Sequence, residues 1–278
     1  MTHLTTGTAL VTGASRGLGQ YIARSLAGRG YNLVLTGRTA AGLESLAEEL
    51  RTSGRAALAV AADLTDEGDQ DRVLQAAERE FGHVDVLVNN AGGDPQREFE
   101  AMPWRENEAI IRLNLLAPMQ LTHKLLPRLL GRRRGHIVNI SSIAGRVGFP
   151  YAEAYAAAKD GLIAFTRVLR HDYRARGVSA SAVILGAIRD AGQGQRTSDE
   201  MGLQMPRLGT SPAHEVGAAV LTAIARDRAE IVVMPGPGRV LKAALDLSPA
   251  LGERMNRMAG ADATMRRVIE FRRAQSPQ

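Results

Sequence analysis

Short apolar runs alternate with longer helical patterns along most of the sequence, and this alternation restricts the possible folds more than any other feature. The apolar runs are typical of buried parallel strands and cover residues 8–12, 32–36, 56–61, 84–88, 135–140, 178–184 and 230–234. One helical pattern includes Tyr21, and the others cover residues 40–53, 66–81, 103–116, 118–130, 151–176 and 214–227. Strands alternating with helices predict an α/β fold, a doubly wound parallel sheet of about seven strands with helices on both faces.

The chain is 278 residues long, which suits one large α/β domain. We therefore predict a single domain over residues 1–278. Its core covers residues 8–234, and a helical C-terminal extension covers residues 235–278.

The absence of cysteine excludes disulfides, thiolate metal sites and a cysteine nucleophile. No other cluster of metal ligands is apparent, so we predict no metal site. The first seven residues lack the apolar core of a secretory signal, and no apolar run is long enough to span a bilayer. We therefore expect a cytoplasmic protein.

The net charge of +6 favours anionic partners. Aromatic residues make up only 4% of the chain, which leaves few side chains on which bases could stack, so we expect no nucleic acid partner. A cofactor that carries phosphate groups would use some of the positive charge.

A glycine-rich turn follows the first predicted strand and precedes a helical pattern. It reads Thr-Gly-x-x-x-Gly-x-Gly, and its candidate binding residues are Gly13, Ser15, Arg16, Gly17, Leu18 and Gly19. Glycines at such a turn let the backbone approach a pyrophosphate, and the amino end of the following helix offers free N–H groups. The turn therefore favours a dinucleotide cofactor over a purely structural role.

Gly37 and Arg38 follow the second predicted strand, where a dinucleotide-binding fold places the adenosine ribose. An acidic residue there would bind the ribose 2′-hydroxyl and repel a 2′-phosphate, whereas guanidinium groups suit a 2′-phosphate. With Arg16 in the glycine-rich turn, Arg38 favours NADP(H) over NAD(H). The alternative interpretation of Arg38 is an exposed loop arginine without a ligand.

Polar or glycine-rich residues also follow the third, fourth and fifth predicted strands. They are Asp63 and Leu64, then residues 89–92 (Asn-Asn-Ala-Gly), then Ser141 and Ser142. Ligands of doubly wound sheets bind beyond the carboxyl ends of the strands. We therefore expect these residues at the same edge as the glycine-rich turn.

Tyr155 and Lys159 are four residues apart in an alanine-rich stretch that favours a helix. Residues four apart share one helix face, so a phenol lies beside an ammonium group. A neighbouring cation lowers the pKa of a tyrosine from its usual value of about 10. Tyr155 is therefore expected to exchange a proton near neutral pH. Taken alone, however, the same spacing is more often a surface helix whose side chains stack.

Together these stretches resemble the short-chain dehydrogenase/reductase family of the Tyr-x-x-x-Lys type. The matching residues, in the family's order, are 12–19, 63–64, 89–92, 114, 141–142 and 155–159, and the resemblance covers roughly residues 8–234. It implies a Rossmann-like domain in which Tyr155 is the general acid and base. It further implies that Lys159 lowers the pKa of Tyr155 and binds the nicotinamide ribose, that Ser142 holds the substrate oxygen, and that Asn114 binds a water molecule linked to Lys159.

The resemblance also implies which residues bind the cofactor. Besides the glycine-rich turn, they are Arg38, Asp63, Leu64, Asn90, Ala91, Gly92, Tyr155, Lys159, Gly186 and Ile188. Asp63 would contact the adenine. The sequence departs from the family after the sixth strand, because Leu185 replaces a frequent proline and Asp190 stands where threonine is common. This departure leaves the contacts of the nicotinamide carboxamide open.

The segment over residues 192–212 is rich in Gly, Gln, Ser and Thr, which predicts a mobile loop over the substrate site. Arg189, Arg196 and Arg207 lie in or beside this segment. They could meet an acidic substrate or be solvated.

The C-terminal extension contains apolar residues at helical spacing between arginines. They are Val240, Leu241, Ala244, Leu245, Leu247, Met255, Met258, Met265, Val268, Ile269 and Phe271. Three interpretations fit this pattern: a cover of the substrate pocket or a subunit interface, a helix on a membrane surface, or packing alone. We favour a cover or an interface.

These features predict an NADP(H)-dependent oxidoreductase that transfers hydride between the nicotinamide and a carbonyl or secondary alcohol substrate. By analogy with extended family members the substrate would be bulky and apolar. The resemblance implies a homodimer or homotetramer. The alternatives are an NAD(H)-dependent alcohol dehydrogenase of the same family and a non-catalytic NADP(H)-sensing binding protein with the same fold.

Overall fold

The computed structural model describes residue 4, residues 6–236, residues 243, 248, 250 and 254, and residues 260–275. Its central sheet consists of β1 (Gly7–Thr12), β2 (Tyr31–Gly37), β3 (Ala57–Ala61), β4 (Val86–Asn89), β5 (Gly135–Ser142), β6 (Val178–Leu185) and β9 (Glu230–Val233). The order is β3-β2-β1-β4-β5-β6-β9, and every pairing is parallel. A separate short pair is formed by β7 (Ile188–Arg189) and β8 (Ser211–Pro212).

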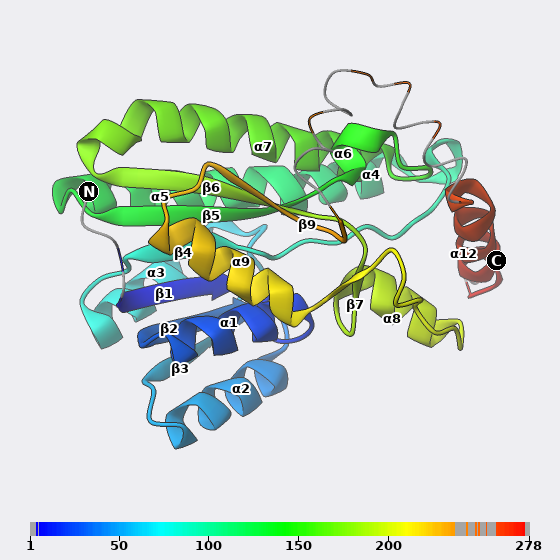
Figure 1. Cartoon of the computed structure of the whole chain (residues 1–278). Coiled ribbons are helices and arrows are strands. Elements are labelled where there is room, and N and C mark those ends of the chain that lie inside the picture. The colour runs from blue at the N-terminus through cyan, green and yellow to red at the C-terminus, as the bar shows by residue number, and fades with distance from the viewer. Residues whose placement is uncertain are drawn as a thin grey trace.

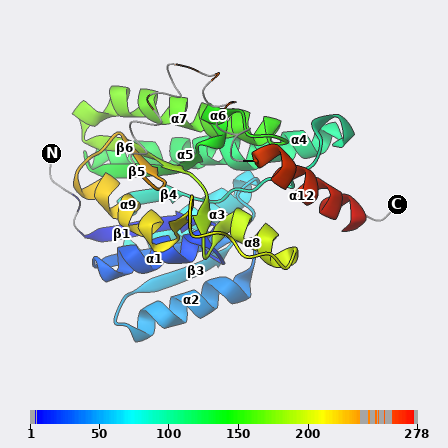
Figure 2. The same cartoon turned by 45° about the vertical axis from the view of Figure 1, so that its right-hand side comes forward.

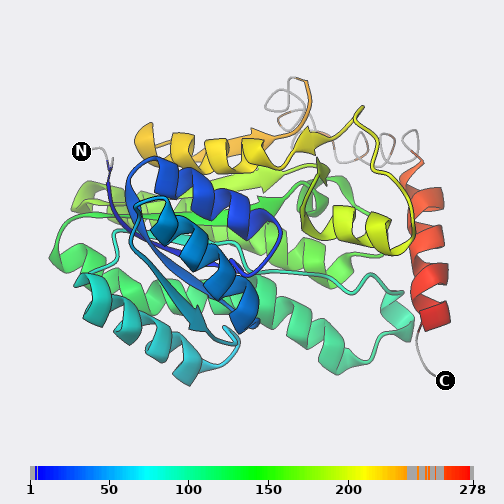
Figure 3. The same ribbon diagram turned by 90° about the horizontal axis from the view of Figure 1, so that it is seen from below.

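Helices cover both faces of this sheet, because successive strand side chains point to opposite faces and are apolar on both. One face carries α1 (Leu18–Gly28), α2 (Ala40–Thr52) and α9 (His214–Ala225), and the other carries α3 (Glu67–Phe81), α5 (Ala117–Gly131) and α7 (Glu153–Tyr173). Val11 of β1 is buried against the first group, and its neighbour Leu10 against the second. Figures 1 and 3 show the two helical layers. The predicted doubly wound fold is confirmed.

The sequence predicts two separate helices between β4 and β5, whereas the structure joins them. α4 (Trp104–Ile111) continues through the π-helical turn η2 (Arg112–Leu116) directly into α5. Pro118 directly follows the π-helical turn and does not end this run. Asn114 lies in the π-helical turn, a feature frequent at functional sites.

The segment over residues 192–212 is more regular than its composition predicts. It begins with α8 (Gly192–Glu200) and ends in β8. The side chain of Gln195 supports α8, since its Oε1 accepts from the Asp190 backbone N at 3.0 Å and its Nε2 donates to Asp199 Oδ1 at 2.7 Å. The prediction of an irregular loop is therefore wrong for its first half. The remaining short helices are η1 (Phe99–Ala101), α6 (Ala144–Val147) and η3 (Arg174–Arg176).

The C-terminal extension includes the helix α12 (Ala261–Gln275), which packs on the rest of the chain. Its apolar side chains Met265, Val268 and Ile269 are buried. Arg272 Nη1 pairs with Glu200 Oε2 of α8 at 2.6 Å, and Arg273 pairs with Glu98. Figure 2 shows α12 (red) beside α8. The apolar residues predicted between 240 and 258 lie outside the described residues.

None of the helices in the described residues is long and apolar enough to cross a membrane.

Candidate active site

The glycine-rich turn between β1 and α1 is tightly packed. Gly13 has a φ of +66°, and a Cβ atom added to it would lie 2.9 Å from Ala91 Cα. A Cβ atom on Gly19 would lie 2.2 Å from the Gly13 carbonyl oxygen, a distance that excludes any side chain. The amino end of α1 has no side-chain cap, so its first N–H groups are available to a ligand.

Asn90 fixes the end of β4 against the end of β1. Its Nδ2 donates to the Thr12 carbonyl oxygen at 2.8 Å, and its backbone N donates to Thr12 Oγ1 at 2.9 Å. The Ala91 backbone N donates to the same hydroxyl at 2.9 Å. Asn90 and Ala91 are thus placed beside the glycine-rich turn.

Arg16 and Arg38 lie at the ends of β1 and β2, and both are exposed. Neither guanidinium forms an ion pair in the part of the chain that the structure describes. At the neighbouring end of β3, Asp63 Oδ1 accepts from the Thr65 backbone N at 2.9 Å and from Thr65 Oγ1 at 2.8 Å. Leu64 is buried next to it. These four residues occupy one end of the carboxyl edge.

Asn114 is fully buried and braces the turn after β4. Its Nδ2 donates to the Gly93 carbonyl oxygen at 2.8 Å and to the Ile110 carbonyl oxygen at 2.9 Å. A Cβ atom on Gly92 would lie 2.6 Å from Asn114 Oδ1 and 3.2 Å from Lys159 Nζ. Only glycine at position 92 therefore allows the turn to approach both side chains.

Ser142 lies close enough to the Tyr155 phenol to lower its pKa. Lys159 Nζ lies 5.6 Å from the centre of the Tyr155 ring and donates to the Ile140 carbonyl oxygen at 3.0 Å. The neighbouring Ser141 has another partner: its buried Oγ donates to the Lys159 carbonyl oxygen at 2.7 Å. Ser142 is therefore the serine of this pair that faces the phenol.

The sequence predicts that Lys159 lowers the pKa of Tyr155, but the structure gives the opposite direction. Burial raises the pKa of Tyr155 to about 12, and the nearby Ser142 hydroxyl opposes this rise only in part. Burial also lowers the pKa of Lys159 to about 8. Helical spacing brings the two side chains together, but the pKa of Tyr155 is set mainly by removal of water from the phenol, and Lys159 is not among its causes.

Asp94 is a titratable residue near Tyr155 that the sequence analysis did not identify. Burial raises the pKa of Asp94 to about 6, with Glu153 adding to this rise, and its charge in turn raises the pKa of Tyr155. The Asp94 backbone N donates to Gln193 Oε1 of α8 at 2.9 Å, and Gln193 Nε2 donates back to the Asp94 carbonyl oxygen. The sequence feature that could have identified Asp94 is its position just after the Asn-Asn-Ala-Gly stretch.

The segment after β6 packs closely, despite its departure from the family's pattern. A Cβ atom on Gly186 would lie 2.9 Å from Met234 Cβ, and Ile188 is buried. Arg189 Nη1 donates to the Thr210 carbonyl oxygen at 2.6 Å. Asp190 is exposed and has a φ of +72°.

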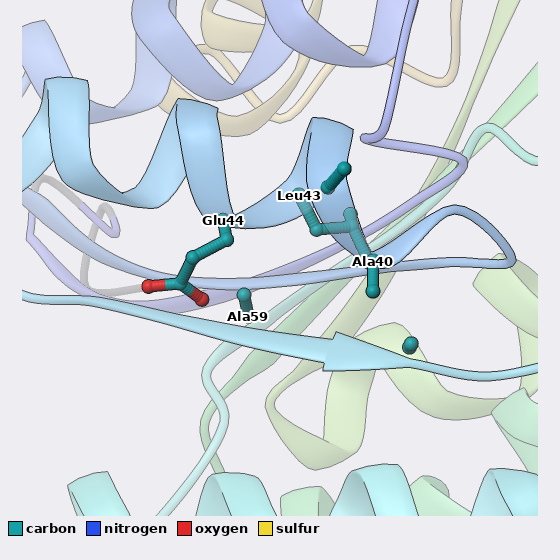
Figure 4. A pocket seen from close by; sticks show the side chains of 6 residues that line it. Ala40, Leu43, Glu44 and Ala59 are labelled. Atoms are coloured by element: carbon teal, nitrogen blue, oxygen red, sulfur yellow. The ribbon is translucent and has the colours of Figure 1, made fainter.

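A hollow of about 360 Å³ lies between the start of α2 and β3. It is lined by Ala40, Ala41, Leu43, Glu44, Ala59 and Ala61 (Figure 4). Its lining is apolar apart from one carboxylate, so it offers no chemistry. In the described residues no group of three or more His, Cys, Asp or Glu side chains could hold a metal ion.

The family described as short chain dehydrogenase matches residues 7–201. The chain belongs to this family. Ketoacyl reductase HetN of Nostoc sp. is 35% identical over 94% of this chain and 91% of its own. The 3-oxoacyl-[acyl-carrier-protein] reductase of Synechocystis sp. is 35% identical over 68% of this chain and 76% of its own.

A solved structure has the same architecture. It is an alcohol dehydrogenase from the archaeon Thermococcus sibiricus, complexed with 5-hydroxy-NADP. Its TM-score is 0.72 at 26% identity, and the match covers 82% of this chain and 96% of that one. This short-chain dehydrogenase is thus an oxidoreductase, and its predicted site residues lie along the carboxyl edge of the sheet.

Proposed function

We propose that this short-chain dehydrogenase is an NADP(H)-dependent reductase of carbonyl groups, with a 3-oxoacyl compound as its substrate class. The observation that carries the proposal is the grouping of Ser142, Tyr155 and Lys159 on the sheet edge that also holds the glycine-rich turn. A complete set of these side chains disfavours a protein that only senses the cofactor.

The residues at the edge fit a dinucleotide phosphate. Gly13 and Gly19 carry no side chain that could obstruct the approach of a ligand to the amino end of α1. Arg16 and Arg38 have no acidic partner in the described chain. The strand order places the Arg38 end three strands from the Ser142 end, a separation that an extended dinucleotide spans. We assign the remaining contacts as predicted, to Ser15, Gly17, Leu18, Asp63, Leu64, Asn90, Ala91, Gly92, Tyr155, Lys159, Gly186 and Ile188.

When bound, the nicotinamide supplies or accepts hydride. In reduction, Ser142 and Tyr155 donate hydrogen bonds to the carbonyl oxygen, which gains negative charge as hydride reaches the carbon. Tyr155 then gives its proton to this oxygen, so that one C–H and one O–H bond form while the C–O π bond breaks. Lys159 stabilises the phenolate that remains, and Asn114 holds the turn that packs against Lys159.

The substrate class rests on the curated relatives. Ketoacyl reductase HetN matches nearly the whole chain, including most of the C-terminal extension. In this chain α12 is tied to α8 and to the loop at Glu98, so the extension helps to enclose the Tyr155 side of the edge. The long acyl group of a substrate would lie along this part of the extension. Subunit association as a dimer or tetramer and a cytoplasmic location remain predictions.

A substrate panel tests the proposed class. We expect NADPH oxidation with 3-oxoacyl thioesters at a kcat/KM at least about tenfold above that with simple ketones, because the acyl group adds binding energy. The measurement is the initial rate at 340 nm for thioesters of increasing chain length against matched 2-ketones. Equal rates for both series would refute the 3-oxoacyl assignment and leave a general carbonyl reductase.

The pKa of Tyr155 predicts different pH profiles for the two directions. Reduction uses the protonated phenol, and with a pKa of about 12 this form predominates at neutral pH. Its kcat/KM should therefore stay nearly constant between about pH 6.5 and 8. Oxidation of the alcohol product uses the phenolate, so its kcat/KM should rise by up to about tenfold per pH unit. A fall of about tenfold in the reductive kcat/KM across this range would contradict a raised pKa of Tyr155, because the titration of Lys159, with a pKa of about 8, is only half complete at pH 8.

A further inference from the structure

α8 rests on the glycine-rich turn. A Cβ atom placed on Gly17 would lie 3.5 Å from the Gly192 backbone N, and one placed on Gly192 would lie 3.4 Å from Leu18 Cδ1. The first residue of α8 is therefore in contact with the point where the turn enters α1. Residues four and eight positions after Gly192 share its face of α8.

Arg196 and Glu200 are on that face, because residues four apart in a helix lie above one another. Arg196 is half-buried. Burial, and next the charge of Arg16 in the glycine-rich turn, lower its pKa, whereas the charge of Glu200 opposes this shift and that of Arg272 of α12 adds to it. Three guanidinium groups from three separate segments are thus gathered beside the candidate cofactor site.

The three guanidinium groups outnumber the carboxylates that act on Arg196. Glu200 is the acidic residue near Arg196, and it pairs with Arg272 at 2.6 Å. Neither Arg16 nor Arg196 forms an ion pair within residues 6–236 or 260–275. Two neighbouring cations, neither of them held in an ion pair, repel each other, and an anion between them removes that cost. A phosphate group matches two guanidinium forks in charge and geometry.

We propose that Arg196 is a second phosphate-binding arginine, carried on α8, that acts together with Arg16 on a phosphate group of the dinucleotide. This inference rests on the proposed NADP(H) dependence. It assigns Arg196 to the cofactor and not to an acidic substrate. Arg189 is unsuited to either role, because its guanidinium already donates to the Thr210 carbonyl oxygen.

α8 also connects the candidate cofactor site to the region around Tyr155. Gln193, in the first turn of α8, exchanges two hydrogen bonds with Asp94, whose charge acts on Tyr155. Thr197, one residue after Arg196, donates to Gln96 Oε1 at 3.1 Å. A phosphate bound at Arg196 would therefore hold in place the helix that borders the catalytic tyrosine.

The test is the dissociation constant of Arg196→Gln for NADPH, NADH and 2′,5′-ADP, measured by nicotinamide fluorescence and by calorimetry. We expect the NADPH constant to rise by about tenfold or more, because a charge-assisted hydrogen bond is lost. A rise for NADPH and 2′,5′-ADP but not for NADH assigns Arg196 to the 2′-phosphate. A similar rise for NADPH and NADH assigns it to the pyrophosphate.

Arg207→Gln is the matched control, because Arg207 lies exposed in the same segment. It should leave all three constants unchanged, and Arg196→Lys should restore part of the lost affinity. Constants for Arg196→Gln that equal those of the wild type would overturn the inference. A wild-type protein that binds none of the three ligands would instead overturn the proposed cofactor, so the two failures are distinct.

Discussion

Replacement of Tyr155 by phenylalanine is expected to lower kcat for carbonyl reduction by about 10³-fold or more, with the NADPH dissociation constant nearly unchanged. The variant loses only the phenolic hydroxyl, which Ser142 influences at this edge. The ring remains and still fills its place beside Lys159. Steady-state kinetics with a 3-oxoacyl thioester and a fluorescence titration with NADPH measure the two quantities.

Tyr173→Phe serves as the control for this variant. Tyr173 ends the same helix, and its ring contacts Arg176 far along the chain from the catalytic pair. Its kcat should equal that of the wild type. Turnover by Tyr155→Phe within about tenfold of the wild type would refute the role of Tyr155 as general acid.

Arg38→Asp is expected to reverse the cofactor preference, with the ratio of kcat/KM for NADPH to that for NADH falling by about 10²-fold or more. The substitution replaces an attractive charge by a repulsive one beside the 2′-phosphate. The new carboxylate can also accept a hydrogen bond from the ribose 2′-hydroxyl of NADH. Arg38 has no other ion pair in the described residues, so little else is lost. Initial rates with each cofactor give the ratio.

Arg79→Asp makes the same charge change on an exposed position of α3 and controls for net charge. It should leave the ratio unchanged. An Arg38→Asp variant that keeps the wild-type preference would show that Arg38 is only a loop arginine. In that case the 2′-phosphate would have to be bound by Arg16 alone or with Arg196.

The architecture was predictable because it depends on local patterns. Each buried strand appears as a short apolar run, and the carboxyl ends of parallel strands must share one edge, so the neighbourhood of the glycine-rich turn, Asn90 and Ser142 follows from strand order. The spacing of Tyr155 and Lys159 likewise fixes their common helix face. These inferences need no knowledge of what surrounds each side chain.

The features that the sequence analysis missed depend on contacts between distant segments. The direction of the Tyr155 pKa is set by burial, which spacing does not reveal. α8 is supported by Gln193 and Thr197, whose partners Asp94 and Gln96 lie about a hundred residues earlier in the chain. A polar composition hides this helix, because hydrogen bonds and not an apolar stripe hold it in place.

The most direct measurement of the central claim is the transfer of deuterium from NADPH labelled at C4 of the nicotinamide to a 3-oxoacyl thioester. With the wild-type enzyme we expect one deuterium on the carbinol carbon of the 3-hydroxyacyl product, detected by mass spectrometry. With Tyr155→Phe we expect almost no product. Tight NADPH binding without any labelled product, across the panel of thioesters and ketones, would contradict the account and identify a binding protein on this fold.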